Sequence, residues 1–322
     1  MDLILHLGAH RGATTSFQHY LRANTGALIA GGTGFWGPGR TRGGLLDGLG
    51  AAPVTPAEVR AANRAAGRVR VNVARSRIAG VRRLLVSDEN MLGTPARCLR
   101  AARLYPDAGH RMARIGSGFG TVTRVVLTIR RQDTWWESVL AHLVARGFPV
   151  PDAARLERIA ADARGWRDVV TDLACALPGA EIVVTPFEAV AGRPQVLFAA
   201  ATGQAGPGAA RDVRRNASLG ADALRARIRA RGETTEDLPQ GDGRWHPFTP
   251  SQTARLREAW ADDMHWLIAG AEGLARLVER EDAGRTGARE TTTGQMEERP
   301  LPLWQSVTGP RGRRHGTEGR LG

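Results

Sequence analysis

The segment LHLGAHRGATTSFQHYLRAN (residues 5–24) joins an apolar, strand-like run to a helical pattern through a short turn. The turn carries one guanidinium, one imidazole and three hydroxyls, on Arg11, His10, Thr14, Thr15 and Ser16. A helix N-terminus presents about four unpaired backbone N–H groups and a partial positive charge, so a tight glycine turn leading into one binds an oxyanion. We therefore predict a phosphate or sulfate site at residues 8–16. The alternative is a plain strand-to-helix turn with a polar cap.

This turn differs from the Walker A loop of P-loop nucleotidases, G-x-x-x-x-G-K-[ST]. Gly12 follows Gly8 by four residues instead of five, and the chain contains no lysine. A different phosphate-binding loop is therefore expected here.

A second candidate anion site lies at the end of the apolar run RVVLTI, residues 124–129. Arg130 ends this run, and Ser138 follows in a helical pattern. Taken separately, Arg130 is better interpreted as a solvated strand end and Ser138 as part of a helix surface. Together with the first turn they predict two anion sites, which suits a nucleotide with phosphates at both ends of its ribose.

Composition limits the class of protein. The 322 residues are 42% hydrophobic and 24% charged, which favours one sizeable globular core or two domains at most. All 45 basic residues are arginine and the net charge is +13, so anionic partners are favoured without a choice among phosphates, acidic glycans and nucleic acid. Cys98 and Cys175 are too few and too isolated for a disulfide framework or a C-x-x-C metal site.

The sequence also carries expectations about location. No apolar run approaches the roughly 20 residues that cross a bilayer, and the N-terminus lacks a secretory pattern. We expect no membrane span and a cytoplasmic protein.

Four apolar runs without polar alternation must position these residues: 3–7, 83–87, 124–129 and 181–185. Helical patterns follow over 15–22, 57–78, 133–146, 152–177, 187–203 and 249–278, and a glycine-rich loop lies at 30–50. Asp133 is a candidate cap of the third of these helices, and either Thr249 or Ser251 is a candidate cap of the last. Buried strands alternating with helices predict a three-layer α/β fold, a mainly parallel sheet with helices on both faces. We expect one domain over 1–282 and a disordered Gly/Arg-rich tail over 283–322.

Ligands of such sheets bind at the carboxyl ends of the strands. Residues 8–16, 88–90 and 130–138 then share one edge of the molecule. The chemistry is expected at that edge.

The motifs on this edge resemble those of one family. GAHRGATTSFQ (8–18) resembles the 5′-phosphosulfate loop of sulfotransferases that use 3′-phosphoadenosine 5′-phosphosulfate (PAPS), and IRRQDTWWES (129–138) resembles their 3′-phosphate motif. LLVSDEN (84–90), RNASLG (215–220) and the closing helix pattern at 248–267 extend the similarity over most of residues 3–270. The resemblance implies a P-loop nucleotide hydrolase-like sulfotransferase fold, PAPS as donor, PAP as product and no required metal.

The resemblance also implies roles. Arg11, Thr14 and Thr15 would hold the 5′-phosphosulfate, with Ser16 and the backbone of Gly12 and Ala13 assisting. Arg130 and Ser138 would hold the 3′-phosphate. The family has lysine where this chain has Arg11, and glycine where it has Ala13; Gly12 beside Ala13 can supply the freedom that the turn needs.

Sulfuryl transfer requires a base that takes the proton of the acceptor hydroxyl or amine. Glu89 is the first choice because it follows a strand at the cleft, beside Arg11; Asp88 is second and His10 is the rival within the loop. The alternatives are a helix cap or an ion pair with Arg11 for the carboxylates, and a loop hydrogen bond for His10.

The acceptor is not specified, and a glycan or another polar metabolite fits the arginine content. Three residues of the RNASLG motif, Arg215, Asn216 and Ser218, are candidates to close over the nucleotide, with a solvated loop as the alternative. Trp135 and Trp136 are candidates for the acceptor pocket, although helical spacing assigns at least one of them to the core.

Two other classes share some of these features. A P-loop small-molecule kinase would share the sheet and the oxyanion loop, but it would need the missing lysine. A noncatalytic arginine-rich nucleic-acid-binding protein is supported only by charge and by RGRRHG (311–316), so nucleic acid is not the expected partner.

Overall fold

The computed structural model describes residues 1–208, 219–235, 238 and 240–278. Within them one sheet has the parallel order β2-β3-β1-β4-β5-β6. The strands are β1 (Asp2–His6), β2 (Thr33–Trp36), β3 (Arg83–Ser87), β4 (Arg124–Ile129), β5 (Glu181–Pro186) and β6 (Arg276–Leu277). The three-layer α/β prediction is confirmed, and the sheet is parallel throughout these strands.

Thirteen helices accompany the sheet in the described ranges. They are α1 (Thr14–Ala23), α2 (Thr25–Ala30), α3 (Pro38–Arg40), α4 (Pro56–Ile78), α5 (Pro95–Ala101), α6 (Ala108–Phe119), α7 (Gln132–Ala145), α8 (Ala153–Ala161), α9 (Trp166–Ala176), α10 (Phe187–Val190), α11 (Pro194–Thr202), α12 (Ala221–Arg229) and α13 (Pro250–Ile268). None of these is long and apolar enough to cross a membrane.

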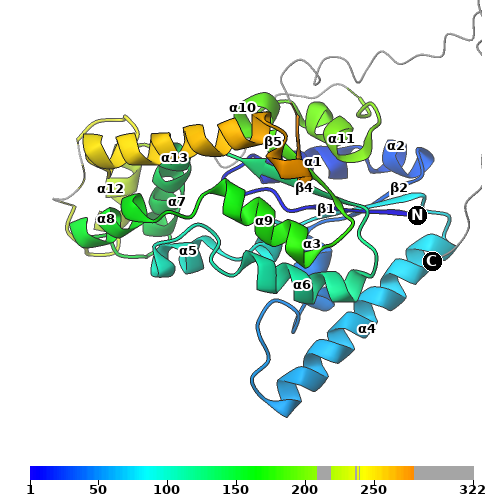
Figure 1. The fold of residues 1–322 in the computed structure, drawn as a ribbon. Coiled ribbons are helices and arrows are strands. Elements are labelled where there is room, and N and C mark those ends of the chain that lie inside the picture. Colours follow the sequence, from blue (N-terminus) through cyan, green and yellow to red (C-terminus); the bar gives the residue numbers. More distant parts are fainter. Residues whose placement is uncertain (209–218, 236–237, 239, 279–322) are drawn as a thin grey trace, which may run out of the picture. The chain divides into compact units, whose positions relative to one another are not determined.

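Alternate residues of each strand face opposite layers. In β1, Ile4 packs with α1, α2, α10 and α11, whereas Leu3 and Leu5 pack into the larger core under α4, α6, α7 and α9. Figure 1 shows α1, α2 and α11 along one side of the sheet and α4, α5 and α6 along the other. Burial on both faces explains why the strands are apolar without alternation.

Local caps explain where the long helices begin. The Thr55 hydroxyl accepts a hydrogen bond from the backbone N–H of Glu58, and the Glu58 carboxylate accepts one from the backbone N–H of Thr55. Pro56 is the first residue of α4. Thr249 and Gln252 form the same kind of box at α13, so the predicted Thr249 cap is confirmed. Asp133 is not a cap: Arg131 precedes α7, and the Asp133 carboxylate accepts from the side chains of Arg131 and Arg257.

Four predicted segments differ from the structure. The predicted glycine-rich loop contains β2, a short strand that pairs with β3 at the edge of the sheet formed by the described residues. The predicted helix over 152–177 is two helices, and the one over 187–203 is also two. The predicted helix over 249–278 ends at Ile268, after which Gly270 takes a positive φ of 96° and β6 follows.

The connections open a cleft at the end of β1. The sheet places β1 between β3 and β4. After β1 the chain passes to α1 on one face, whereas after β3 and β4 it passes to α5 and α7 on the other face. Chains that part in this way at the carboxyl ends of parallel strands leave a crevice for a ligand.

Two further predictions fall on undescribed residues. Arg215, Asn216 and Ser218 lie outside the described ranges, as does the predicted tail at 283–322.

Candidate active site

A cleft of about 1090 Å³ lies at the predicted edge. It is lined by nearly every predicted site residue: His10, Arg11, Ala13, Thr14, Thr15, Ser16, Glu89, Arg130 and Ser138. Gly12 does not line it, because its N–H donates to the carbonyl of Ala9 at 2.9 Å and it packs against that turn. The two predicted anion sites and the candidate base therefore share one cavity.

The loop between β1 and α1 is held in a left-handed backbone. Gly8, Arg11 and Ala13 take φ values of 44°, 64° and 64°. Gly12 has no positive φ, so the prediction that it supplies the freedom of the turn is wrong. Glycine is needed at position 12 for another reason: a Cβ there would lie 2.7 Å from the carbonyl oxygen of Ala9.

Hydrogen bonds join the two predicted anion sites. Nε of Arg11 donates to Oγ of Ser138 at 2.9 Å, and Nη1 of Arg130 donates to the carbonyl of Arg11 at 3.4 Å. The Arg130 guanidinium also lies 4.7 Å from the centre of the Phe187 ring. Burial lowers the pKa of both arginines, because the charged form is poorly solvated there. A bound anion would relieve that cost.

The carboxylates after β3 are held by an arginine that the sequence did not single out. Nη2 of Arg42 lies 2.6 Å from Oδ1 of Asp88 and 2.8 Å from Oε1 of Glu89. The remaining oxygen of Asp88 accepts from Thr41 at 2.5 Å, and Oδ1 also caps the backbone N–H of Asn90. Of the two alternatives to a catalytic role, the helix cap is present for Asp88, whereas the ion pair with Arg11 is wrong because the cationic partner of both carboxylates is Arg42.

Glu89 is oriented from two sides. Arg42 binds Oε1, and Nε2 of Gln18 donates to Oε2 at 3.0 Å. Burial alone would raise the pKa of Glu89, but the hydrogen bond and charge of Arg42 overcome it and lower the pKa. The same contacts raise the pKa of Arg42 against the effect of its own burial. Glu89 is thus an ionised, fixed carboxylate on the wall of the cleft.

His10 is bound on both ring nitrogens. The Tyr105 hydroxyl lies 2.9 Å from the backbone N of His10 and 2.9 Å from its Nδ1, and Oδ1 of Asn90 lies 3.0 Å from Nε2. The hydroxyl accepts from the backbone N–H, so it donates to Nδ1, and this network assigns the ring proton to Nε2. Burial lowers the pKa of His10, so the ring is neutral at pH 7. The loop hydrogen bonds weighed against a catalytic role are present.

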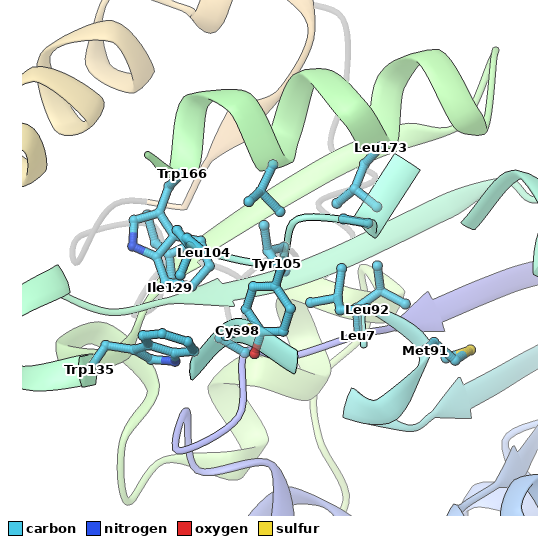
Figure 2. Packing of buried hydrophobic residues seen from close by; sticks show 14 of the residues in the cluster. Leu7, Met91, Leu92, Cys98, Leu104, Tyr105, Ile129, Trp135, Trp166 and Leu173 are labelled. Atoms are coloured by element: carbon cyan, nitrogen blue, oxygen red, sulfur yellow. The ribbon is translucent and has the colours of Figure 1, made fainter. Parts of the chain in front are cut away.

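Three buried aromatic rings pack together next to the site and hold its backbone. Figure 2 shows Tyr105, Trp135 and Trp166 together. Their ring centres lie 5.5–6.2 Å apart. The indole of Trp135 donates to the carbonyl of His10, and that of Trp166 donates to the carbonyl of Arg130, both at 2.8 Å. Trp135 and Trp136 are 0% and 3% exposed, so neither lines the cleft as an acceptor wall.

The supporting residues were not found from the sequence because each acts through a long-range contact. Arg42 sits in an irregular turn (Thr41–Leu45) with Gly43 and Gly44, which resembles any glycine-rich loop. Tyr105 and Trp166 lie in segments without a motif. A lone buried tyrosine or tryptophan gives no signal of which backbone carbonyl or N–H it will meet.

Comparisons with known proteins add no family. A scan against family models, a search of curated proteins and a search of solved structures each gave no match for this chain.

Proposed function

We propose that the protein transfers a sulfuryl group from PAPS to a hydroxyl or amine of an acceptor. The observation that carries the proposal is the single cleft in which the 8–16 loop, the Arg130 and Ser138 pair and the Glu89 carboxylate meet. Arg11 links the loop to the Arg130 and Ser138 pair, because it donates a hydrogen bond to Ser138 and its carbonyl accepts one from Arg130. One bisphosphorylated nucleotide across this cleft would contact both cationic groups.

The donor half holds and polarises the nucleotide. Arg11, Thr14 and Thr15 contact the 5′-phosphosulfate, with Ser16 and the N-terminus of α1 adding donors. Arg130 and Ser138 contact the 3′-phosphate. Because in-line transfer leaves little covalent work to the protein, fixed charges and positioning supply most of the rate enhancement.

The transfer step balances without another reactant. The acceptor oxygen or nitrogen attacks sulfur and forms the new bond, while the bond from sulfur to the bridging phosphate oxygen breaks. The acceptor proton passes to the Glu89 carboxylate, and the negative charge on the departing PAP oxygen is stabilised by Arg11. Arg11 presents a planar fork in place of a compact ammonium, which suits two oxygens of the phosphosulfate at once.

Calorimetric titration with PAP, ATP and NADH tests the donor before any acceptor is known. We expect PAP to bind without magnesium and ATP and NADH to bind at least about tenfold more weakly, because only PAP offers both phosphates to the two cationic groups. The kinase alternative would be favoured if ATP bound as tightly as PAP, or if ATP bound only in the presence of magnesium.

A further inference from the structure

The lining of the cleft has two sides, which come from different elements. We call one side the donor arm, formed by Arg130, Phe187, Ala191, Gly192 and Arg244. The Arg130 guanidinium packs on Phe187 there, and after burial the charge of Arg244 is the strongest influence lowering the pKa of Arg130. These residues therefore lie near one another and beside the predicted 3′-phosphate contacts.

The other side is the acceptor arm, formed by Pro95, Ala96, Arg100, His142, Arg146 and Phe148. It lies between α5 and the C-terminal half of α7. Burial, followed by the charges of Arg11 and Arg146, lowers the pKa of His142 to about 4, which places this neutral ring near both arginines. Glu89 and Asn90 line the same cleft just before α5 in the chain, and Asn90 binds His10, whose charge also lowers the pKa of His142.

Two cations of the acceptor arm lack an acidic partner within the described ranges. Neither Arg100 nor Arg146 forms an ion pair with any residue that the structure describes, although both side chains line the cleft. Two arginines near Arg100 in the chain are different: Arg97 of α5 lies 2.6 Å from Asp107, and Arg103, just after α5, lies 2.8 Å from Asp162. In the same cleft, Arg42 is matched by two carboxylates. Arg100 and Arg146 differ from these arginines, as do Arg130 and Arg244 of the donor arm, because they form no ion pair with a described residue.

The arm also has apolar walls. Pro95 and Leu143 are buried, and Phe148 is half-buried, beside the two exposed guanidinium groups. Cations next to apolar surface suit a ligand with a compact ring or hydrocarbon body and an anionic substituent.

We propose that the acceptor is itself an anion, a hydroxyl or amino compound whose carboxylate, phosphate or sulfate group binds Arg100 and Arg146 while its nucleophile faces Glu89. That the bound anion is an acceptor rests on the proposed function, but the preference of the arm for anions can be measured without sulfuryl transfer.

The test uses pairs of probes that differ in charge. Calorimetry at low ionic strength, with and without saturating PAP, compares 4-hydroxybenzoate with 4-hydroxybenzamide and glucuronate with glucose. On the PAP-loaded protein we expect at least one anion to bind about tenfold more tightly than its neutral partner, from two exposed charge contacts. Arg100→Gln and Arg146→Gln should each reduce the preference. Arg64→Gln, an exposed arginine of α4 outside the cleft, should retain it.

The remaining outcomes decide against the proposal. No preference in either pair overturns it, and so does a preference that survives both substitutions. A preference abolished by Arg11→Ala alone places the anion in the donor loop and also overturns it. If PAP itself fails to bind, the proposed function fails, while the effect of Arg100→Gln and Arg146→Gln on the PAP-free preference still decides the anion site.

Discussion

The loops that follow the neighbouring strands β1 and β3 line one cleft. Burial disfavours the charged side chain after β1, whereas the protein stabilises the charged side chains after β3. After β1, Arg11 lies in a strained loop, and burial depresses its pKa. After β3, Asp88 and Glu89 are bound to Arg42, Thr41 and Gln18, and the pKa values of Glu89 and Arg42 move toward the charged forms. In the first region burial disfavours the charged form of Arg11. In the second region the charged forms of Glu89 and Arg42 are stabilised by contacts within the protein, before any ligand binds.

This difference assigns separate tasks to the two regions. A desolvated cation gains most from an incoming anion, so the β1 side suits ligand binding. A carboxylate with both oxygens bound is fixed in place, so the β3 side suits a step that needs orientation. Changes on the β3 side should affect turnover, and changes on the β1 and β4 side should affect nucleotide affinity.

Glu89→Gln should have the largest effect. It keeps the shape of the side chain but removes the proton acceptor, so turnover should fall by about 10²- to 10⁴-fold. The measurement is PAP released from PAPS with an acceptor found by screening, and the PAP affinity should stay within about twofold because only the β3 side has changed. Glu157→Gln, in an exposed pair with Arg255, is the control. Unchanged turnover would move the base to His10 or Asp88.

His6 tests the contact between the two regions. It ends β1, is fully buried, and its Nδ1 lies 2.8 Å from Oγ of Ser87, to which Gln18 also donates. Burial lowers its pKa from 6.5 to about 4. Between pH 6.5 and about 4, His6 is protonated in the unfolded chain but stays neutral in the folded protein. Its contribution to the free energy of unfolding is therefore complete above pH 6.5 and is lost as the pH falls toward 4. The loss over this window is up to about 3 kcal/mol.

Urea unfolding at several pH values between 4 and 7 measures this loss. His6→Leu should reduce the pH dependence of the free energy of unfolding by the share of His6 and leave the share of His10 and His142, whose pKa values burial also lowers. The exposed His110→Gln should retain the wild-type slope. The same slope in His6→Leu as in the wild type would show that other groups carry the acid sensitivity.

Arg130→Ala tests the cationic side directly. Loss of a charge-assisted contact worth about 1.5–3 kcal/mol should raise the Kd for PAP by about 10- to 150-fold in calorimetry. Arg131→Ala is a close control, because the Arg131 guanidinium is paired with Asp133 and does not line the cleft. Equal effects of the two substitutions would contradict the assignment of Arg130 to the nucleotide.

Local sequence patterns were enough to predict the central strands. β1, β3, β4 and β5 are continuous apolar runs buried on both faces, so composition alone marks them. β2 escaped because Gly34 lies at its centre and glycines flank it, and its pairing with β3 depends on neighbours far along the chain. The break between α8 and α9 escaped for a similar reason: Asp263 of α13 caps α9 by accepting from the N–H groups of Trp166 and Arg167.

The site was predictable where a strand end fixed the position of a residue. The loop at 8–16, Glu89 and Arg130 each follow a strand directly, so the parallel sheet brought them to one cleft. The partner of Glu89 could not be predicted, because Arg42 reaches it from an irregular turn 47 residues earlier in the chain. Partner identity depends on tertiary packing, which no spacing in the sequence encodes.

Ala13 offers the smallest and most local test of the strained side. Its φ of 64° and ψ of 14° are left-handed, a conformation that costs a non-glycine residue roughly 1 kcal/mol or more. Ala13→Gly should therefore raise the free energy of unfolding by about 0.5–1 kcal/mol after the larger entropy of the unfolded glycine chain is counted. Ala74→Gly, at an exposed position inside α4, should lower it by about 1 kcal/mol. Opposite signs in urea unfolding would locate strain in the loop after β1, whereas losses of equal size at both positions would show that Ala13 carries none.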